Sequence, residues 1–158
     1  MQSAQLWAMR STCSRSKVGV VIAADDNRIL CTGYNGAPAG LTHCDHTCDC
    51  DYELMRQDAI VHGHMFVNPG HRKECESLQS CTVSVHAETN AIAYAARCGI
   101  STGDSRMYVT LSPCYRCAQQ IINAGINQVI YLNEYRITDG LELLATAGVD
   151  VVKYTHGS

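Results

Sequence analysis

Apolar and polar positions follow one another in short blocks near the start of the chain. Residues 18–24 form a β-branched apolar run, residues 25–27 are polar, and residues 28–33 return to an apolar pattern. Two such runs joined by a short polar turn are typical of a β-hairpin. Before the hairpin, the stretch at 4–12 predicts a short helix.

The second half of the chain alternates between helical and strand patterns. In residues 86–99, Ala87, Ala91 and Ala95 recur at helical spacing and give a small-residue packing face, and Gly99 is a good stop signal. The elements predicted after it are a strand at 106–111, a helix at 114–125, a strand at 128–132, a helix at 138–148 that Thr138 can cap, and a strand at 149–154. This order predicts an α/β domain of three layers, α/β/α, around a mixed sheet.

The length and the cysteine content of the chain indicate one domain that contains an insertion. A chain of 158 residues with 46% hydrophobic residues fits one domain, spanning residues 1–158. Residues 34–80 are rich in Gly, Pro, His, Cys and Asp without a clear period, which is typical of a functional insertion or of disorder. Ten cysteines without an export signal favour metal binding or catalysis over disulfides. We therefore expect a Cys/His-rich insertion at about 41–82.

Charge and hydropathy exclude some partners. The net charge is −3, so no overall basic field attracts nucleic acid, and an anionic substrate needs locally placed cations. No leader pattern and no apolar run of about 20 residues is present, which predicts a soluble protein with no membrane partner. We expect it to be cytoplasmic.

The pair Cys114 and Cys117 follows a predicted strand and opens a predicted helix. Three interpretations compete: a redox dithiol, two buried thiols without a role, or half of a zinc site. Thiolates three positions apart at a helix start can both face one ion, and the helix dipole favours their charge.

A second motif upstream decides between these interpretations. His86 and Glu88 lie at the start of another predicted helix, so that two helix N-termini could bring one His and two Cys to a single Zn²⁺. Three protein ligands leave a fourth position for water, which is typical of catalytic zinc. The pairing of H-x-E with P-C-x-x-C is a described signature of zinc deaminases.

With these motifs the chain resembles the cytidine deaminase superfamily. The stretches "STCSRSKVGVVI" and "GYNGAPAGLTHC" further resemble deoxycytidylate (dCMP) deaminases, over about residues 11–135. The resemblance implies hydrolysis of dCMP to dUMP and ammonia in pyrimidine nucleotide metabolism. It also implies a five-stranded sheet, a homo-oligomer (dimer, trimer or hexamer), and a cytoplasmic location, or the host cytoplasm if the source is viral.

The resemblance also implies roles for individual residues. The catalytic zinc ligands are His86, Cys114 and Cys117, and Glu88 shuttles protons between water, the ring nitrogen and the leaving amino group. The substrate contacts are Asn35, the backbone of Ala87, the carbonyl of Ser112, Tyr135, and Arg15 or Lys17 for the phosphate. The alternative is that these residues have no role in binding: Asn35 would then be a turn residue, Tyr135 a core aromatic, and Arg15 and Lys17 solvated surface charges.

Relatives also suggest a second metal and an allosteric switch. A structural zinc is expected on Cys13, Cys44, Cys48 and Cys81, for any of which Cys50, Cys75, His43, His46 or His71 could substitute. The alternative is an insertion with unliganded thiols. The expected effectors are dCTP as activator, together with Mg²⁺, and dTTP as inhibitor. Tyr94 and Arg97 lie where relatives place residues tied to this control.

Three rival functions remain open at this point. The closest is another deaminase, acting on CMP, on a 5-substituted dCMP, or on free cytidine, guanine or tRNA adenosine. A non-catalytic zinc-stabilised binding module would have no use for Glu88. A thiol oxidoreductase explains the two cysteines but leaves His86 and Glu88 without a role.

Overall fold

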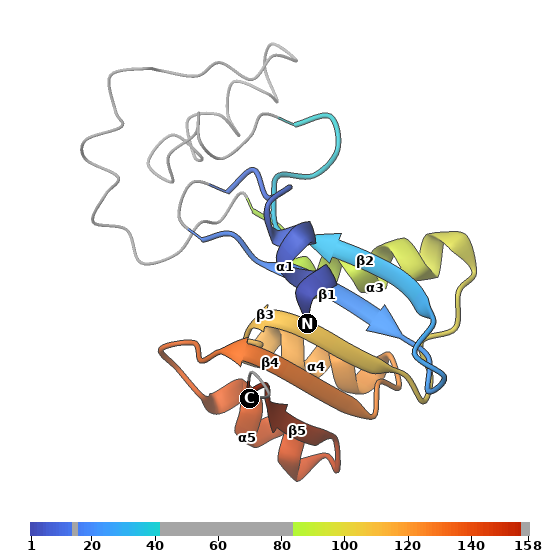
Figure 1. Ribbon diagram of the computed structural model, residues 1–158, viewed down its shortest axis with the longest axis vertical. Helices are drawn as coiled ribbons and strands as arrows, with labels where there is room; N and C mark the ends of the chain where they lie inside the picture. The colour runs from blue at the N-terminus through green and yellow to red at the C-terminus, as the bar shows by residue number, and fades with distance from the viewer. Residues whose placement is uncertain (14–15, 42–83, 156–158) are drawn as a thin grey trace, which may run out of the picture. The chain divides into compact units, whose positions relative to one another are not determined.

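A mixed sheet forms the centre of the protein. The structure, a computed structural model, describes residues 1–13, 16–41 and 84–155. Within them five strands lie in the order β2-β1-β3-β4-β5 (Figure 1). The strands are β1 Gly19–Ala23, β2 Ile29–Tyr34, β3 Arg106–Leu111, β4 Gln128–Asn133 and β5 Asp150–Lys153. Strand β1 pairs antiparallel with β2 and β3, whereas β3, β4 and β5 run parallel. The predicted hairpin and mixed five-stranded sheet are confirmed.

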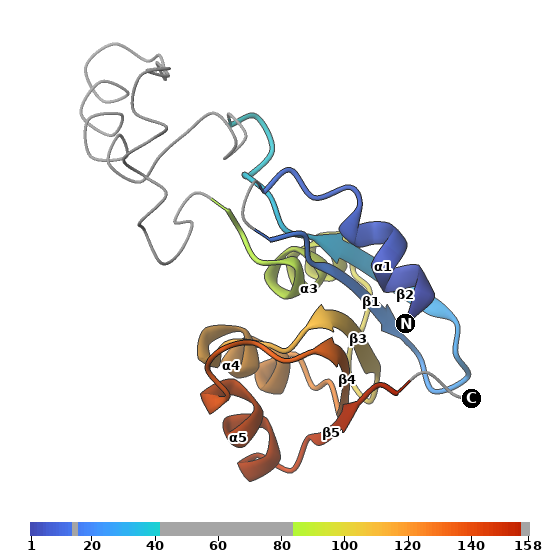
Figure 2. The same cartoon turned by 60° about the vertical axis from the view of Figure 1, so that its left-hand side comes forward.

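Helices cover both faces of this sheet. They are α1 Gln2–Ala8, α3 Ala87–Cys98, α4 Tyr115–Asn123 and α5 Asp139–Thr146. Figure 2 shows α1 on one face and α3, α4 and α5 on the other. The predicted three-layer α/β/α architecture is therefore confirmed. None of the described helices is both long and apolar enough to cross a membrane.

The described residues belong to two units. One comprises Met1–Ser11, Lys17–Asn35 and His86–Ser158, and contains the sheet and the four helices. The other comprises Thr12–Ser16 and Gly36–Val85, in which Gly36 and Val85 form an antiparallel bridge. Most of the insertion expected at 41–82 lies outside the described residues, so one domain with an insertion stays a prediction.

The core lies between the sheet and α3, α4 and α5. Ala87, Ala91 and Ala95 are at most 1% exposed, which confirms the small-residue face of α3. Small side chains are needed there because a Cβ on Gly33 of β2 would lie 2.4 Å from the carbonyl oxygen of Ala87. The fully buried partners from the strands and the other helices are Val20, Ile22, Met107, Val109, Ile121, Val129 and Leu144.

The ends of α3 and α4 agree with the sequence, whereas the bounds of α1 do not. Gly99 and Gly125 adopt left-handed φ values of 67° and 72° just beyond α3 and α4, as their stop signals predict. The N-terminal helix, predicted at 4–12, instead begins at residue 2 and ends at Ala8, because the amides of residues 9–11 bond to carbonyls three residues back.

Thr138 stands at the N-cap of α5 as predicted, but its side chain makes no capping bond. Its φ of −100° and ψ of 3° depart from the extended conformation that aims a capping hydroxyl at the helix amides. Instead, its backbone carbonyl accepts bonds from the amides of Leu141 and Glu142, at 2.9 and 3.2 Å.

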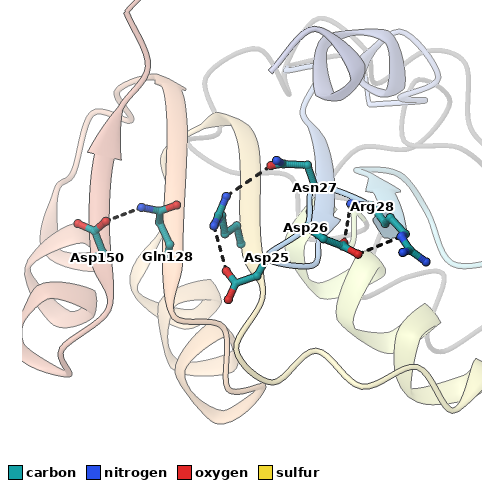
Figure 3. A network of polar contacts seen from close by, with 7 residues as sticks. Asp25, Asp26, Asn27, Arg28, Gln128 and Asp150 are labelled. Atoms are coloured by element: carbon teal, nitrogen blue, oxygen red, sulfur yellow. Dashed lines mark hydrogen bonds and ion pairs between the residues drawn. The ribbon is translucent and has the colours of Figure 1, made fainter.

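The β1–β2 turn and the first residues of β3, β4 and β5 carry a row of exposed polar contacts (Figure 3). The guanidinium of Arg106 pairs with the Asp25 carboxylate at 3.0 Å and donates to the Asn27 side chain at 3.4 Å. Gln128 donates to Asp150 on the neighbouring strand. Exposed pairs of this kind stabilise a fold by about 0–1 kcal/mol each. The candidate metal ligands Cys114 and Cys117 follow the other end of β3.

Candidate active site

One imidazole and two thiols meet where α3 and α4 begin. His86 is the N-cap of α3, Cys114 is the N-cap of α4, and Cys117 lies one turn into α4. The Nδ1 atom of His86 is 3.6 Å from Sγ of Cys114 and 3.3 Å from Sγ of Cys117. In the part of the chain that the structure describes, these residues are the one group of three or more metal-ligand side chains.

The spacing of these atoms fits a zinc ion. With zinc–nitrogen and zinc–sulfur bonds of about 2.05 and 2.3 Å at a tetrahedral angle, a nitrogen and a sulfur ligand lie about 3.6 Å apart. The two measured separations, 3.6 and 3.3 Å, agree with this value. The donor set of one nitrogen and two sulfurs is also one that catalytic zinc sites use.

The electrostatics of the thiols point the same way. Hydrogen bonds from the Cys117 thiol, from His86 and from the Cys117 backbone amide lower the pKa of Cys114 well below its usual value. Donating the first of these bonds, together with burial, raises the pKa of Cys117. A divalent cation bound here would hold both sulfurs as thiolates and release their protons.

Glu88 stands beside this cluster without belonging to it. The residue lies in the first turn of α3 and is 4% exposed. Burial raises the pKa of its carboxyl, whereas its own backbone amide, His86 and contact with the Cys117 side chain act in the opposite direction. A buried carboxyl in contact with one ligand can transfer protons at the metal without holding it.

The carboxamide of Asn35 has a fixed orientation at the end of β2. Its Oδ1 accepts the backbone N–H of Val18 at 2.8 Å and the hydroxyl of Ser11 at 2.7 Å. Because a backbone N–H can only donate, the atom that faces it is the oxygen, and the NH₂ group lies on the other side of the carboxamide. Asn35 is 7% exposed, so a purely exposed turn does not describe it.

Ser112 links the loop after β3 to the loop after β4 through two hydrogen bonds. It follows β3 directly, is 3% exposed, and donates its backbone N–H to the carbonyl of Asn133 at 2.8 Å. Its hydroxyl accepts the backbone N–H of Tyr135 at 2.7 Å. Tyr135 is half-buried, and the guanidinium of Arg136 lies 5.7 Å from the centre of its ring.

Residues 1–133 match the family model described as the cytidine and deoxycytidylate deaminase zinc-binding region. The chain belongs to this deaminase family. The match includes all three residues of the His-Cys-Cys cluster and Glu88.

Relatives in this deaminase family resemble the chain over most of its length. The deoxycytidylate deaminase of Enterobacteria phage T2 is 37% identical, over 96% of this chain and 88% of that protein. The corresponding enzyme of Mycobacterium phage D29 is 40% identical, over 80% of this chain and 86% of that protein. The dCMP deaminase of cyanophage S-TIM5, solved with dCMP and dUMP, has a TM-score of 0.72 and 32% identity, covering 97% of this chain and 92% of that one.

The structure brings the four central residues of the predicted deaminase site together and leaves other predictions untested. Ala87, at the start of α3 beside His86, is fully buried. Cys13 is 5% exposed. The residues that lie outside the described part of the chain are Arg15, Cys44, Cys48, Cys81, Cys50, Cys75, His43, His46 and His71. The ligand set of a second metal therefore stays a prediction.

The residues expected to take part in allosteric control lie farther along α3. Tyr94 is 45% exposed, and the guanidinium of Arg97 lies 5.4 Å from the centre of its ring. Tyr94 lies about eight positions beyond His86, which corresponds to about 12 Å along a helix. The two residues form a surface pair away from the metal ligands, and their control function stays a prediction.

Sequence reasoning missed one residue that orients Asn35. Ser11 is 8% exposed, and its hydroxyl bonds both oxygens of Asn35. Its position was included in the stretch that resembles the family, but a serine between Arg10 and Thr12 gives no signal of burial.

Proposed function

We propose that the protein hydrolyses the amino group of dCMP, giving dUMP and ammonia. The observation that carries this proposal is the buried Glu88 carboxyl beside a His-Cys-Cys cluster with the separations of a zinc site. A structural zinc site has no use for an unliganded carboxyl next to its ligands. The relatives that are 37% and 40% identical, both named deoxycytidylate deaminases, support the choice of substrate.

In this proposal His86, Cys114 and Cys117 hold the zinc ion. When bound, zinc acts as a Lewis acid and lowers the pKa of a water molecule toward neutrality. His86 and Cys114 lie at two helix N-caps, so an ion held by them would sit where the positive helix ends stabilise the thiolate charge.

Glu88 moves the protons of the reaction. It accepts one proton as water adds to C4 of cytosine, and it gives this proton to ring nitrogen N3. It then takes the proton of the new C4 hydroxyl and transfers it to the amino group, so that the C4–N bond breaks and ammonia leaves. Burial favours this cycle, because a carboxyl that is 4% exposed exchanges protons with the substrate rather than with bulk water.

Several residues orient the nucleotide. Asn35, whose carboxamide is fixed by Val18 and Ser11, offers its NH₂ group as a donor. The backbone of Ala87 and the carbonyl of Ser112 contact the base, and Tyr135 lies along the nucleotide. Arg15 and Lys17 remain the predicted partners of the phosphate.

The finer proposals concern a second metal, effectors and assembly. We propose a structural zinc on Cys13, Cys44, Cys48 and Cys81, activation by dCTP with Mg²⁺, inhibition by dTTP, a homo-oligomer, and a cytoplasmic location. Metal analysis of pure protein tests the second zinc, since about two zinc ions per chain are expected for two sites. Saturation curves for dCMP with and without each effector test the regulation, and identical curves would exclude it.

The central experiment measures ammonia release from dCMP, CMP, dCTP, deoxycytidine and a 5-substituted dCMP. We expect dCMP to be the best substrate by kcat/KM. A higher value for CMP or for the 5-substituted dCMP would reassign the substrate within the same chemistry. No release from any of them by zinc-loaded protein would favour a binding module.

A matched variant, Glu88→Gln, tests the role of the carboxyl. It should keep its zinc content, because Glu88 is not a ligand. Its turnover should fall by about 10²–10⁴-fold, the usual contribution of a general acid–base group. A variant that keeps most of its activity would disprove the proton-transfer role of Glu88.

A further inference from the structure

The first turn of α5 lies directly against the peptide that carries a zinc ligand. Gly140 is the second residue of α5 and is buried. A Cβ added to it would lie 2.2 Å from the carbonyl oxygen of Pro113, and 2.8 and 2.9 Å from the carbonyl carbon and oxygen of Cys114. All three neighbours are backbone atoms, so they cannot turn away as the end of a flexible side chain can.

The contacted peptide is held from several sides. The carbonyl oxygen of Cys114, one of the three neighbours, also accepts the backbone N–H of Ala118 at 2.9 Å in the first turn of α4. The amide of Ser112, two residues earlier, is bonded to Asn133. On the other side α5 is anchored by Leu144, which is fully buried in the core. Neither partner has room to withdraw without breaking other contacts.

The displacement that a side chain would force exceeds what a metal site tolerates. Real Cβ atoms essentially never approach other atoms within 3.0 Å, so the backbone of Gly140 and the oxygen of Pro113, 2.2 Å from such a Cβ, would have to separate by at least about 0.8 Å. Functional constellations need their groups held within about 0.5 Å of the working geometry. The Cys114 sulfur is attached to the backbone that would move.

We propose that Gly140 is a positioning residue for the zinc centre: its lack of a side chain lets α5 support the Pro113–Cys114 peptide and so places the Cys114 sulfur next to Cys117 and His86. Gly140 touches neither metal nor substrate and acts through the backbone of Cys114. The proposal concerns metal retention, so it holds or fails whichever nucleotide the protein uses.

The test compares Gly140→Ala with two other glycine variants of the full chain. Gly19→Ala is the matched control, since its Cβ would lie 2.1 and 2.4 Å from backbone atoms of α1, on the other face of the sheet. Gly103→Ala is the benign control, because its nearest neighbour is a serine hydroxyl at 3.7 Å. Zinc affinity is measured by chelator competition, and site geometry by the absorption of the Co²⁺-substituted proteins. A Cys114→Ser protein shows which Co²⁺ bands belong to this site.

We expect Gly140→Ala to bind zinc at this site about 10–100-fold more weakly, the usual effect of losing support for a ligand. Its cobalt–thiolate bands should also shift. Gly19→Ala should lower thermal stability but keep the zinc affinity and the spectrum, and Gly103→Ala should change neither. Unchanged zinc affinity in Gly140→Ala, or an equal loss in Gly19→Ala, would overturn the proposal.

If Gly140→Ala does not fold without metal, zinc is titrated into the refolding reaction. Recovery that needs at least tenfold more zinc than Gly19→Ala needs supports the positioning role. Failure to recover at any zinc concentration, while Gly19→Ala recovers normally, would make Gly140 a requirement for folding as such and would overturn the proposal.

Discussion

The hydroxyl of Ser11 offers a sharp test of how Asn35 is oriented. In Ser11→Ala, Asn35 loses the hydroxyl donor whose oxygen lies 2.7 Å from its Oδ1 and 2.8 Å from its backbone oxygen. The side-chain oxygen keeps the bond from the amide of Val18. Because that partner remains, the loss should be near the usual net value of about 0.5–1.5 kcal/mol for one hydrogen bond. For a chain of this size that lowers the melting temperature by about 1–6 °C.

The same substitution should weaken substrate binding. Without Ser11 the carboxamide oxygen loses one of the bonds that orient it, and a binding loss of about 1 kcal/mol corresponds to a roughly fivefold higher KM for dCMP. Zinc content should not change, since Ser11 is not one of the expected ligands and its hydroxyl bonds to Asn35. The assay is steady-state ammonia release, run beside thermal unfolding and metal analysis.

Ser105→Ala is the control for this prediction. Ser105 is 1% exposed and donates its hydroxyl to the carbonyl of Thr102 at 2.6 Å, next to the start of β3 and away from the metal ligands. The Ser105→Ala variant should show a similar drop in melting temperature to Ser11→Ala, with no change in KM. Equal KM values for both variants and the unsubstituted protein would refute the inference that Ser11 orients a substrate-binding group.

Two further predictions concern the metal and the core. Removing zinc with a chelator should abolish activity and lower the melting temperature, because a bound ion links the starts of α3 and α4. Adding zinc back should restore both. Activity that survives verified metal loss would contradict a catalytic zinc. Ala91→Leu should lower the free energy of unfolding, measured in urea, by about 1–3 kcal/mol. Ala91 is fully buried, and even a Cβ on Gly33 of β2 would lie 3.0 Å from the Cβ of Ala91, so a larger side chain has no room. Ala93→Leu, at an exposed position of the same helix, should be nearly neutral, and equal losses would refute this packing argument.

Local patterns in the sequence predicted the elements well, and they also named the three residues that the structure brings together as a possible metal site. The strands from β3 onward have unbroken β-branched or aromatic runs, and the stop signals of Gly99 and Gly125 depend only on local backbone conformation. This grouping could be expected because H-x-E and P-C-x-x-C each place their residues within a few positions of a helix start.

Contacts between distant segments could not be predicted in the same way. The bonds from Ser11 to Asn35 span 24 positions, and the approach of Gly140 to Cys114 depends on how α5 packs against the loop after β3. Neither pairing has a local signal, because it arises only when the sheet brings these segments together. The capping of α5 failed for a related reason, since Thr138 has a backbone conformation set by its loop rather than by its residue type.

The polar row at the β1–β2 turn has a practical consequence. Because β1 runs antiparallel to β3, this turn lies beside the first residue of β3, whereas Cys114 and Cys117 follow the last. Asp26 and Arg28 have side chains 54% and 85% exposed, and they bond mainly to each other. A fluorophore, affinity handle or surface linkage attached at either position would therefore leave the approach to the zinc ligands open.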